Sequence, residues 1–132
     1  MIDLHIHLLP GIDDGPADAA GTVELARACV ADGVQAVAAT PHVSEKYPTT
    51  PARMRQGVEE ARAAITAAGV PLTVYGGAEV AIDQMTRLSD EDLRGLTLGP
   101  TEGFILLETP YAAWPMELET QVGRLATLGI RG

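Results

Sequence analysis

Short apolar runs alternate with amphipathic stretches along the chain. The apolar runs cover residues 1–7, 34–40, 72–79 and 104–108 and are mostly continuous, as in strands that are buried on both faces. The segment after each run spaces its apolar residues as a helix does, which predicts helices over 18–33, 50–69, 89–93 and 115–128. Four strand-then-helix units in this order predict an α/β fold with a parallel sheet and right-handed crossovers.

Capping residues mark the ends of the two longest predicted helices. Asp18 suits the N-cap of the first helix, and Gly33 is its stop signal. Thr50 starts the second helix with a cap and Pro51 follows in the first turn, while Gly69 ends it. Both helices therefore have a predicted beginning and end.

Composition and charge narrow the class of protein. The 132 residues are 46% hydrophobic and carry a formal net charge of −9, which predicts one globular domain. An acidic chain lacks the excess of Lys and Arg that neutralises phosphates, so we expect no nucleic-acid partner and no attraction to anionic membranes. No stretch approaches the ~20 apolar residues of a membrane span and no signal-peptide pattern is present, so we expect a cytoplasmic location.

The first apolar run ends in two alternating histidines, His5 and His7. Residues i and i+2 of a strand point to the same face, so both imidazoles can face one metal ion. A bare His-x-His pair is more often a pair of core or surface histidines, since imidazole has many roles besides metal binding. The positions of the other histidine, aspartate and glutamate residues therefore decide between the two interpretations.

The other apolar runs also end in residues of the metal-binding type. His42 follows the second run, Glu79 closes the third and Glu108 closes the fourth. In parallel α/β folds the carboxyl ends of the strands form one functional face, so ligands scattered in the sequence are expected to converge there. Imidazoles mixed with carboxylates suit Mn²⁺, Fe or Zn²⁺.

Four ordered motifs make the chain resemble the polymerase and histidinol phosphatase (PHP) superfamily. They are M-I-D-L-H-I-H-L-L-P-G-I-D-D-G at 1–15, A-T-P-H at 39–42, G-A-E-V at 77–80 and I-L-L-E at 105–108. Within that superfamily the chain most resembles the bacterial manganese-dependent tyrosine-protein phosphatases of capsular and exopolysaccharide synthesis. The resemblance covers essentially all of the sequence.

The resemblance implies a fold and a set of metal ligands. The fold is a distorted (β/α)₇ TIM-like barrel, of which residues 1–132 would be the N-terminal portion with about four βα units, forming a PHP metal-dependent phosphatase domain. Up to three ions, most readily Mn²⁺ with Zn²⁺ or Fe as alternatives, would be bound at the strand ends. The implied ligands are His5 and His7 for the first ion, Glu79 bridging the first and second, Glu108 for the second, and Asp14 with His42 for the third. Asp14 is favoured over Asp13 because the family motif places the ligand immediately before the glycine.

The implied reaction is hydrolysis of a phosphomonoester by a metal-bound hydroxide, with no side chain assigned as catalytic. The lone Cys29 is then a buried small hydrophobe and not a nucleophile. The implied substrate is a phosphotyrosine protein, in particular a bacterial tyrosine kinase. Tyr111 and Trp114 could wall a pocket for the phosphotyrosine ring, although packing is an equally good interpretation. Histidinol-phosphate hydrolysis and a non-catalytic, truncated PHP module are the alternative functions.

The sequence also departs from the resembled family. Its members are roughly twice as long, and their second half carries an H-P-E-R segment and a late D-x-H motif that this sequence lacks. We therefore expect a C-terminally incomplete domain with little activity of its own. An open half-barrel would leave strand residues such as Val37, Val74 and Ile105 poorly covered, which predicts self-association.

Overall fold

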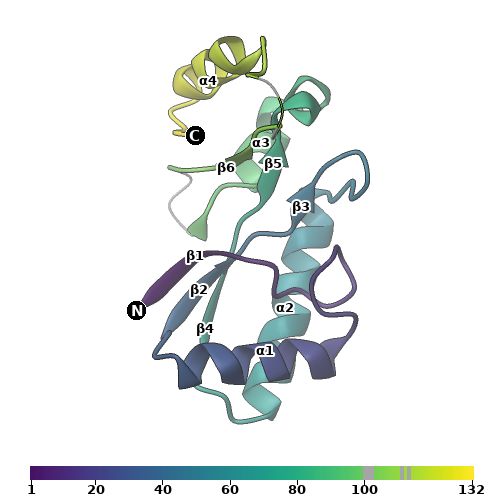
Figure 1. Cartoon of the computed structure of the whole chain (residues 1–132), viewed down its shortest axis with the longest axis vertical. Helices are drawn as coiled ribbons and strands as arrows, with labels where there is room; N and C mark the ends of the chain where they lie inside the picture. Colours follow the sequence, from purple (N-terminus) through teal and green to yellow (C-terminus); the bar gives the residue numbers. More distant parts are fainter. Residues whose placement is uncertain (100–102, 111, 113) are drawn as a thin grey trace.

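The computed structural model describes residues 1–99, 103–110, 112 and 114–132. Six strands form two parallel three-stranded sheets (Figure 1). The first sheet has the order β1-β2-β4 and the second β3-β5-β6. Their bounds are β1 Ile2–Ile6, β2 Ala36–Ala39, β3 His42–Val43, β4 Thr73–Gly76, β5 Glu79–Ala81 and β6 Leu106–Glu108. The parallel α/β class predicted from the sequence is confirmed.

The third predicted strand reaches both sheets, and the second is followed directly by a short strand in the other sheet. The chain leaves β2 and enters β3 after Pro41, and it leaves β4 and enters β5 after Gly77 and Ala78. Proline has no amide N–H for a sheet ladder. A Cβ added to Gly77 would lie 2.5 Å from Leu98 Cδ2, so the chain runs very close to its neighbour there. These breaks were not predicted from the continuous apolar runs.

The division changes where two candidate residues lie. His42 and Glu79 were predicted at the carboxyl ends of strands, but each is the first residue of a strand in the second sheet. They pair with each other in register across β3 and β5. Glu108 is the last residue of β6, as predicted. The candidate site therefore lies where the two sheets meet.

Among the described residues, four α-helices and the 3₁₀ segment η1 lie between or after the strands. Their bounds are α1 Ala19–Ala31, α2 Pro51–Ala67, η1 Ile82–Arg87, α3 Asp90–Gly95 and α4 Leu118–Thr127. Asp18 caps α1 by accepting from Gly21 N–H, and Thr50 caps α2 by accepting from Arg53 N–H, so both predicted caps are confirmed. Ser89 and Asp92 form a reciprocal capping box at α3. None of the described helices is long and apolar enough to cross a membrane.

Two separate hydrophobic cores underlie the two sheets. The first joins the β1-β2-β4 sheet to α1 and α2, and includes Cys29, Leu9, Val37 and Val74. The second joins the β3-β5-β6 sheet to η1, α3 and α4, and includes Leu93, Leu125 and Ile105 among others. Val37, Val74 and Ile105 are all buried, so the expectation that they would be poorly covered is wrong. These side chains point toward the helices, which cover that face of the strands.

The opposite strand face carries four of the large exposed apolar residues. Ile2, Leu4, Tyr75 and Phe104 are large exposed side chains that line a hollow of about 530 Å³. Alternation along β1 and β4 explains this, since residues on the helix-covered face leave their neighbours facing outward. Exposed contiguous apolar surface favours association. Self-association of the chain stays a prediction.

Substituting Ala for Gly123 in α4 should raise the free energy of unfolding by about 0.5–1 kcal/mol, because Gly is unfavourable within a helix. A Cβ at Gly123 meets nothing within 4 Å. The matched control is Gly57→Ala in α2, where the added Cβ would lie 3.1 Å from Leu9 Cδ1. The same gain in helix propensity should there be offset by overpacking. Urea unfolding measures both, and an equal gain for the two variants would contradict the packing argument.

Candidate metal centre

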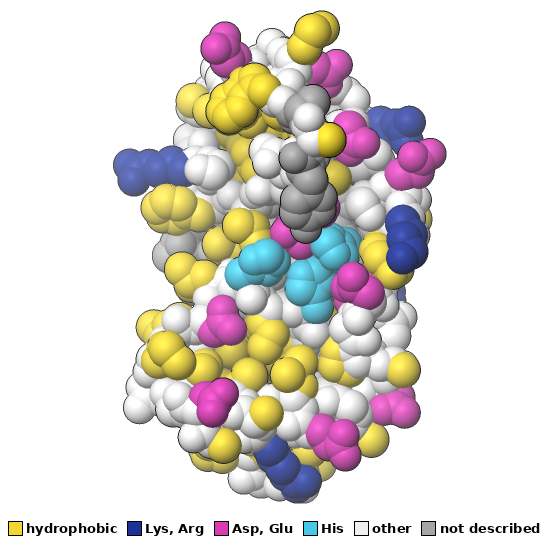
Figure 2. Space-filling model, in the orientation of Figure 1, with side chains coloured by type: hydrophobic (Ala, Val, Ile, Leu, Met, Phe, Trp, Pro, Cys, Tyr) yellow, Lys and Arg dark blue, Asp and Glu magenta, His cyan; other side chains and the backbone are white. Residues whose placement is uncertain are grey.

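The structure brings together all six predicted ligand residues at the junction of the two sheets. Figure 2 shows the three histidines gathered in the middle of one face, with acidic side chains beside them. His5 lies in β1 and His7 directly follows it, while Asp14 lies in the loop before α1. The second sheet supplies His42, Glu79 and Glu108. Residues from both sheets and one loop thus converge on one small region.

Glu79 lies at the centre of the cluster. Its Oε1 is 3.3 Å from His5 Nε2, and its Oε2 is 3.3 Å from His7 Nε2 and 3.1 Å from His42 Nδ1. The Nε2 atoms of His5 and His7 are 3.4 Å apart. The buried carboxylate therefore faces ring nitrogens of all three histidines.

The remaining carboxylates extend the cluster on two sides of His42. Asp14 Oδ1 lies 3.6 Å from His42 Nε2 and 3.5 Å from His7 Nδ1. Glu108 Oε2 lies 3.5 Å from His42 Nδ1. Among the described residues, three overlapping groups have ligand atoms within 4.8 Å of one another and could hold an ion: His5–His7–Glu79, His7–Asp14–His42 and His42–Glu79–Glu108.

His42 shows that this arrangement fits a cation. Its Nδ1 is buried and makes no hydrogen bond to any described residue, although two carboxylate oxygens lie within 3.5 Å of it. The distances are short but the angles do not suit a hydrogen bond. A buried polar atom without a partner is costly, and a cation between an imidazole nitrogen and carboxylates would satisfy it. The donor set of imidazoles and carboxylates suits Mn²⁺, Fe or Zn²⁺.

Asp13, which sequence reasoning set aside, is tightly bound within the site. Its side chain is 0% exposed. Asp13 Oδ2 accepts from His7 Nδ1 at 2.8 Å and from His42 N–H at 2.9 Å, and Oδ1 accepts from Gly15 N–H at 3.0 Å. The bond to Gly15 is an Asx-turn that the Asp-x-Gly pattern could have predicted. The bond to His42 spans 29 residues and had no sequence signal.

These contacts shift two pKa values in opposite directions. The hydrogen bond to Asp13 raises the pKa of His7, burial opposes this, and the charges of Asp13, Glu79 and Asp14 add to the rise. Burial alone would raise the pKa of Asp13, but the hydrogen bonds from His7, Gly15 and His42 outweigh burial and lower it. Asp13 is therefore the ionised acceptor and His7 Nδ1 the donor.

Comparison with known proteins places the chain in a family. Residues 1–131 match the family described as capsular polysaccharide synthesis, CpsB/CapC. The chain belongs to the CpsB/CapC family. This agrees with the group of capsular phosphatases that the sequence motifs resemble.

Named relatives of this CpsB/CapC chain include two bacterial proteins. The tyrosine-protein phosphatase YwqE of Bacillus subtilis is 34% identical over 120 residues, which are 90% of this chain and 47% of YwqE. CapC of Staphylococcus aureus is 25% identical over an alignment 135 residues long, which covers 98% of this chain and 51% of CapC. The chain thus spans about half the length of these relatives.

A solved structure supports the fold of this CpsB/CapC chain. It comes from a crystallographic study of YwqE from Bacillus subtilis and CpsB from Streptococcus pneumoniae, described as unique metal-dependent tyrosine phosphatases. The TM-score is 0.81 at 30% identity, and the match covers 98% of this chain and 53% of the solved chain. The two folds therefore correspond over nearly the whole length described.

One aromatic residue of the CpsB/CapC chain contacts the cluster directly, and it is not one of the two that the sequence suggested. Tyr47 stacks on His42, with ring centroids 5.7 Å apart and an interplanar angle of 13°, and Lys46 Nζ lies 4.8 Å from the Tyr47 ring centroid. Tyr111 lies outside the described residues. Trp114 is 78% exposed, so it does not have the packing role that was its alternative interpretation. A role of Trp114 or Tyr111 in a substrate pocket stays a prediction.

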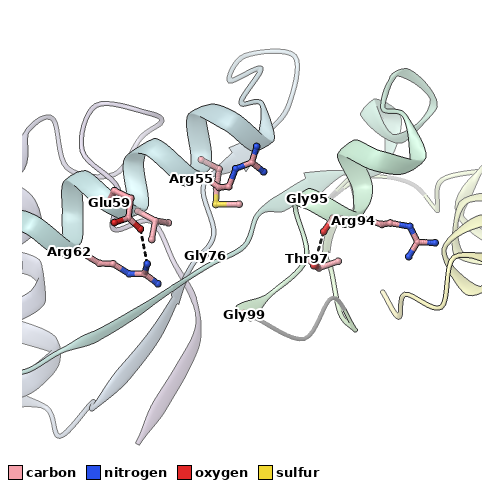
Figure 3. Close-up of a pocket in the computed structure, with 10 residues that line it drawn as sticks. Arg55, Glu59, Arg62, Gly76, Arg94, Gly95, Thr97 and Gly99 are labelled. Atoms are coloured by element: carbon pink, nitrogen blue, oxygen red, sulfur yellow. Dashed lines mark hydrogen bonds and ion pairs between the residues drawn. The ribbon is translucent and has the colours of Figure 1, made fainter.

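A second hollow in this CpsB/CapC chain lies between α2 and α3, with Gly76 of β4 between them, and has a volume of about 490 Å³ (Figure 3). Two of the arginines that line it, Arg62 and Arg94, bind backbone carbonyls of the same chain. Arg62 donates to Val74 O at 2.9 and 2.7 Å, and Arg94 donates to Leu128 O at 3.0 Å. In Figure 3 the Arg94 guanidinium points away from Arg62. The described lining residues include no histidine, so this hollow lacks the metal-binding chemistry of the junction.

Proposed function

We propose that the chain forms the metal-binding part of a metal-dependent protein-tyrosine phosphatase that acts in capsular or exopolysaccharide regulation. The substrate would be a phosphotyrosine protein, in particular a bacterial tyrosine kinase. Residues 1–132 would be the N-terminal portion of a distorted (β/α)₇ TIM-like PHP barrel, with about four βα units. Family membership and the tyrosine phosphatases among the similar proteins support this function.

One observation carries the proposal. Within the part of the chain that the structure describes, the buried Nδ1 of His42 has no hydrogen-bond partner, yet it faces the carboxylates of Glu79 and Glu108. A purely structural cluster would pair these atoms with each other by hydrogen bonds. A cluster made to receive cations would leave ring nitrogens and carboxylate oxygens open toward a common point.

We propose that the ions are Mn²⁺, with Zn²⁺ or Fe as alternatives. The residues that would hold them are His5, His7, Asp14, His42, Glu79 and Glu108. Bound divalent ions lower the pKa of water and stabilise negative charge on a phosphate ester during hydrolysis. Glu79 presents its two oxygens to different imidazoles, which suits a bridge between two ions. Asp14 is 57% exposed and lies at the open side of the cluster, where a substrate can approach.

A non-catalytic metal-binding module is the second candidate. Among the ion pairs of the described residues, none joins a Lys or Arg to the six cluster residues. A phosphatase needs donors that hold the phosphate as charge develops on it. This observation favours the alternative for these residues taken alone. Histidinol phosphate is the other substrate to test.

The first test is metal uptake. Calorimetric titration with Mn²⁺ and Zn²⁺ should show binding by the wild-type chain and a large loss in the His5→Ala, His7→Ala double variant, because both Nε2 atoms face Glu79. Glu24→Gln is the matched control, since Glu24 is exposed on α1 and belongs to none of the three groups. Equal uptake by wild type and the double variant would overturn the proposal.

A substrate panel then separates the candidate functions. Phosphate release would be followed from a phosphotyrosine peptide, a phosphoserine peptide and histidinol phosphate, each with Mn²⁺ and with a chelator. The proposal expects any release to be fastest from the phosphotyrosine peptide and to stop with the chelator. A preference for histidinol phosphate would favour that enzyme, and metal uptake without any release would favour the non-catalytic module.

A further inference from the structure

The Asp13 carboxylate joins three parts of the candidate centre. Its Oδ2 accepts from the His7 ring at the end of β1 and from the main chain of His42 at the start of β3. Its Oδ1 accepts from Gly15, within the loop that carries Asp14. One buried group therefore connects the first sheet, the second sheet and the intervening loop.

The bond to His7 decides which ring nitrogen of His7 is open. Two of the three candidate groups include His7, one with His5 and Glu79 and the other with Asp14 and His42. Asp13 Oδ2 accepts from His7 Nδ1 at 2.8 Å, which keeps the ring proton on Nδ1. The Nε2 atom of His7 then carries the free lone pair. It lies 3.4 Å from His5 Nε2 and 3.3 Å from Glu79 Oε2. A neutral imidazole cannot donate from Nδ1 and bind a cation there at the same time.

The Asp13 oxygen that accepts from His7 also accepts a hydrogen bond from a second histidine, His42. His42 N–H donates to Asp13 Oδ2 at 2.9 Å, so the start of β3 is tied to the carboxylate that orients His7. The rings of His7 and His42 lie 4.4 Å apart between centroids. A displacement of Asp13 would therefore move two candidate ligands together.

Asp13 belongs to none of the three candidate ion groups, and both of its oxygens already accept hydrogen bonds. Its three donors occupy both oxygens, and the side chain is 0% exposed, whereas the neighbouring Asp14 is 57% exposed. Gly15 packs on the same turn, because a Cβ there would lie 2.5 Å from the His7 carbonyl oxygen. The turn thus buries Asp13 and leaves Asp14 toward the open side.

We propose that Asp13 is a positioning residue that commits His7 Nε2 to the ion site shared with His5 and Glu79, and that it is not itself a ligand. Outer carboxylates of this kind fix the tautomer and orientation of metal-binding histidines. The inference rests on the proposed function in that the cluster receives cations. Its effect on the His7 tautomer is testable without any ion.

The first test is the tautomer of His7 in the metal-free chain. Nitrogen-15 NMR of the imidazole rings at about pH 9, well above the ordinary histidine pKa of about 6.5, reports which nitrogen carries the proton. Wild type should show His7 with its proton on Nδ1. Asp13→Asn and Asp13→Ala should shift His7 toward the Nε2 proton, and Asp14→Asn should leave it unchanged. A wild-type His7 with its proton on Nε2 overturns the proposal without recourse to any variant.

The second test is the number and affinity of ions bound. Asp13→Asn should keep the wild-type number of Mn²⁺ ions at saturation and weaken binding by about 10–100-fold, the range for lost outer carboxylates. Asp14→Asn should bind fewer ions. If Asp13→Asn bound fewer ions at saturation than wild type while the His7 tautomer stayed unchanged, Asp13 would be a ligand. That result would overturn the proposal. If wild type binds no ion, the proposed function fails, while the tautomer measurement still decides whether Asp13 controls His7.

Discussion

Replacing Glu79 with Gln should weaken Mn²⁺ binding by more than about 100-fold. That value is the upper end of the loss when a residue that only supports a metal ligand is removed. Glu79 belongs to two of the three candidate groups, and its oxygens lie within 3.3 Å of nitrogens from His5, His7 and His42. Gln keeps the size of the side chain, but it removes the negative charge and one acceptor oxygen. Its amide would also direct N–H groups toward the site that an ion needs. Calorimetric titration measures the loss.

The matched control for Glu79 is Glu108→Gln. Glu108 belongs to one candidate group and its side chain is 31% exposed, so its loss should disturb one ion and be smaller. Thermal unfolding with a chelator checks that both variants are folded. If Glu108→Gln were the more damaging of two folded variants, Glu79 would not be the bridge. The same order is expected for any metal-dependent phosphate release.

Replacing Leu9 with Ala should lower the free energy of unfolding by about 2–5 kcal/mol, the usual cost of a large cavity in a core. Leu9 is fully buried in the core beneath the first sheet. It also packs against α2, because a Cβ at Gly57 would lie 3.1 Å from Leu9 Cδ1. Urea unfolding in the presence of a chelator isolates this effect from metal binding.

Leu4→Ala is the control for Leu9, with the same chemical change only five residues away. Leu4 is 61% exposed on the uncovered face of β1, so its truncation should change stability by less than about 0.5 kcal/mol. Equal losses for the two variants would mean that the exposed face of β1 is covered in solution. A loss below about 1 kcal/mol at Leu9 would contradict the described core.

Local signals in the sequence predicted the helices well. Asp18 and Thr50 cap α1 and α2 through their own side chains, and such contacts depend only on residues three positions away. The 3₁₀ segment η1 was not predicted, because no capping or periodic signal separates it from β5. The division of the 72–79 run and the short strand β3 after the 34–40 run were also missed, since the hydrophobic pattern does not record where a chain passes from one sheet to the next.

Five of the six candidate ligands were predictable because each follows or ends an apolar run, whereas Asp14 was implied by the family resemblance alone. His5, Glu79 and Glu108 lie on three different strands, of which β5 and β6 are parallel neighbours in one sheet and β1 belongs to the other, so the three residues meet where the two sheets join. Asp13 was not predictable as a contact of His42, since that hydrogen bond depends on how the loop folds over β1. Sequence reasoning compared Asp13 and Asp14 only as rival ligands, whereas the structure gives them different environments.

The two hydrophobic cores have a consequence for how the molecule unfolds. His5 and His7 come from the sheet over one core, and Glu79 comes from the sheet over the other. An ion held between them would act as a cross-link that couples two otherwise distinct cooperative units. By mass action, ligand at 100 times its Kd adds about 2.7 kcal/mol to the stability of the native state. The concentration of metal would then determine whether the two cores unfold separately or in one transition. The unfolding curve of the chain would therefore report whether the ion is bound.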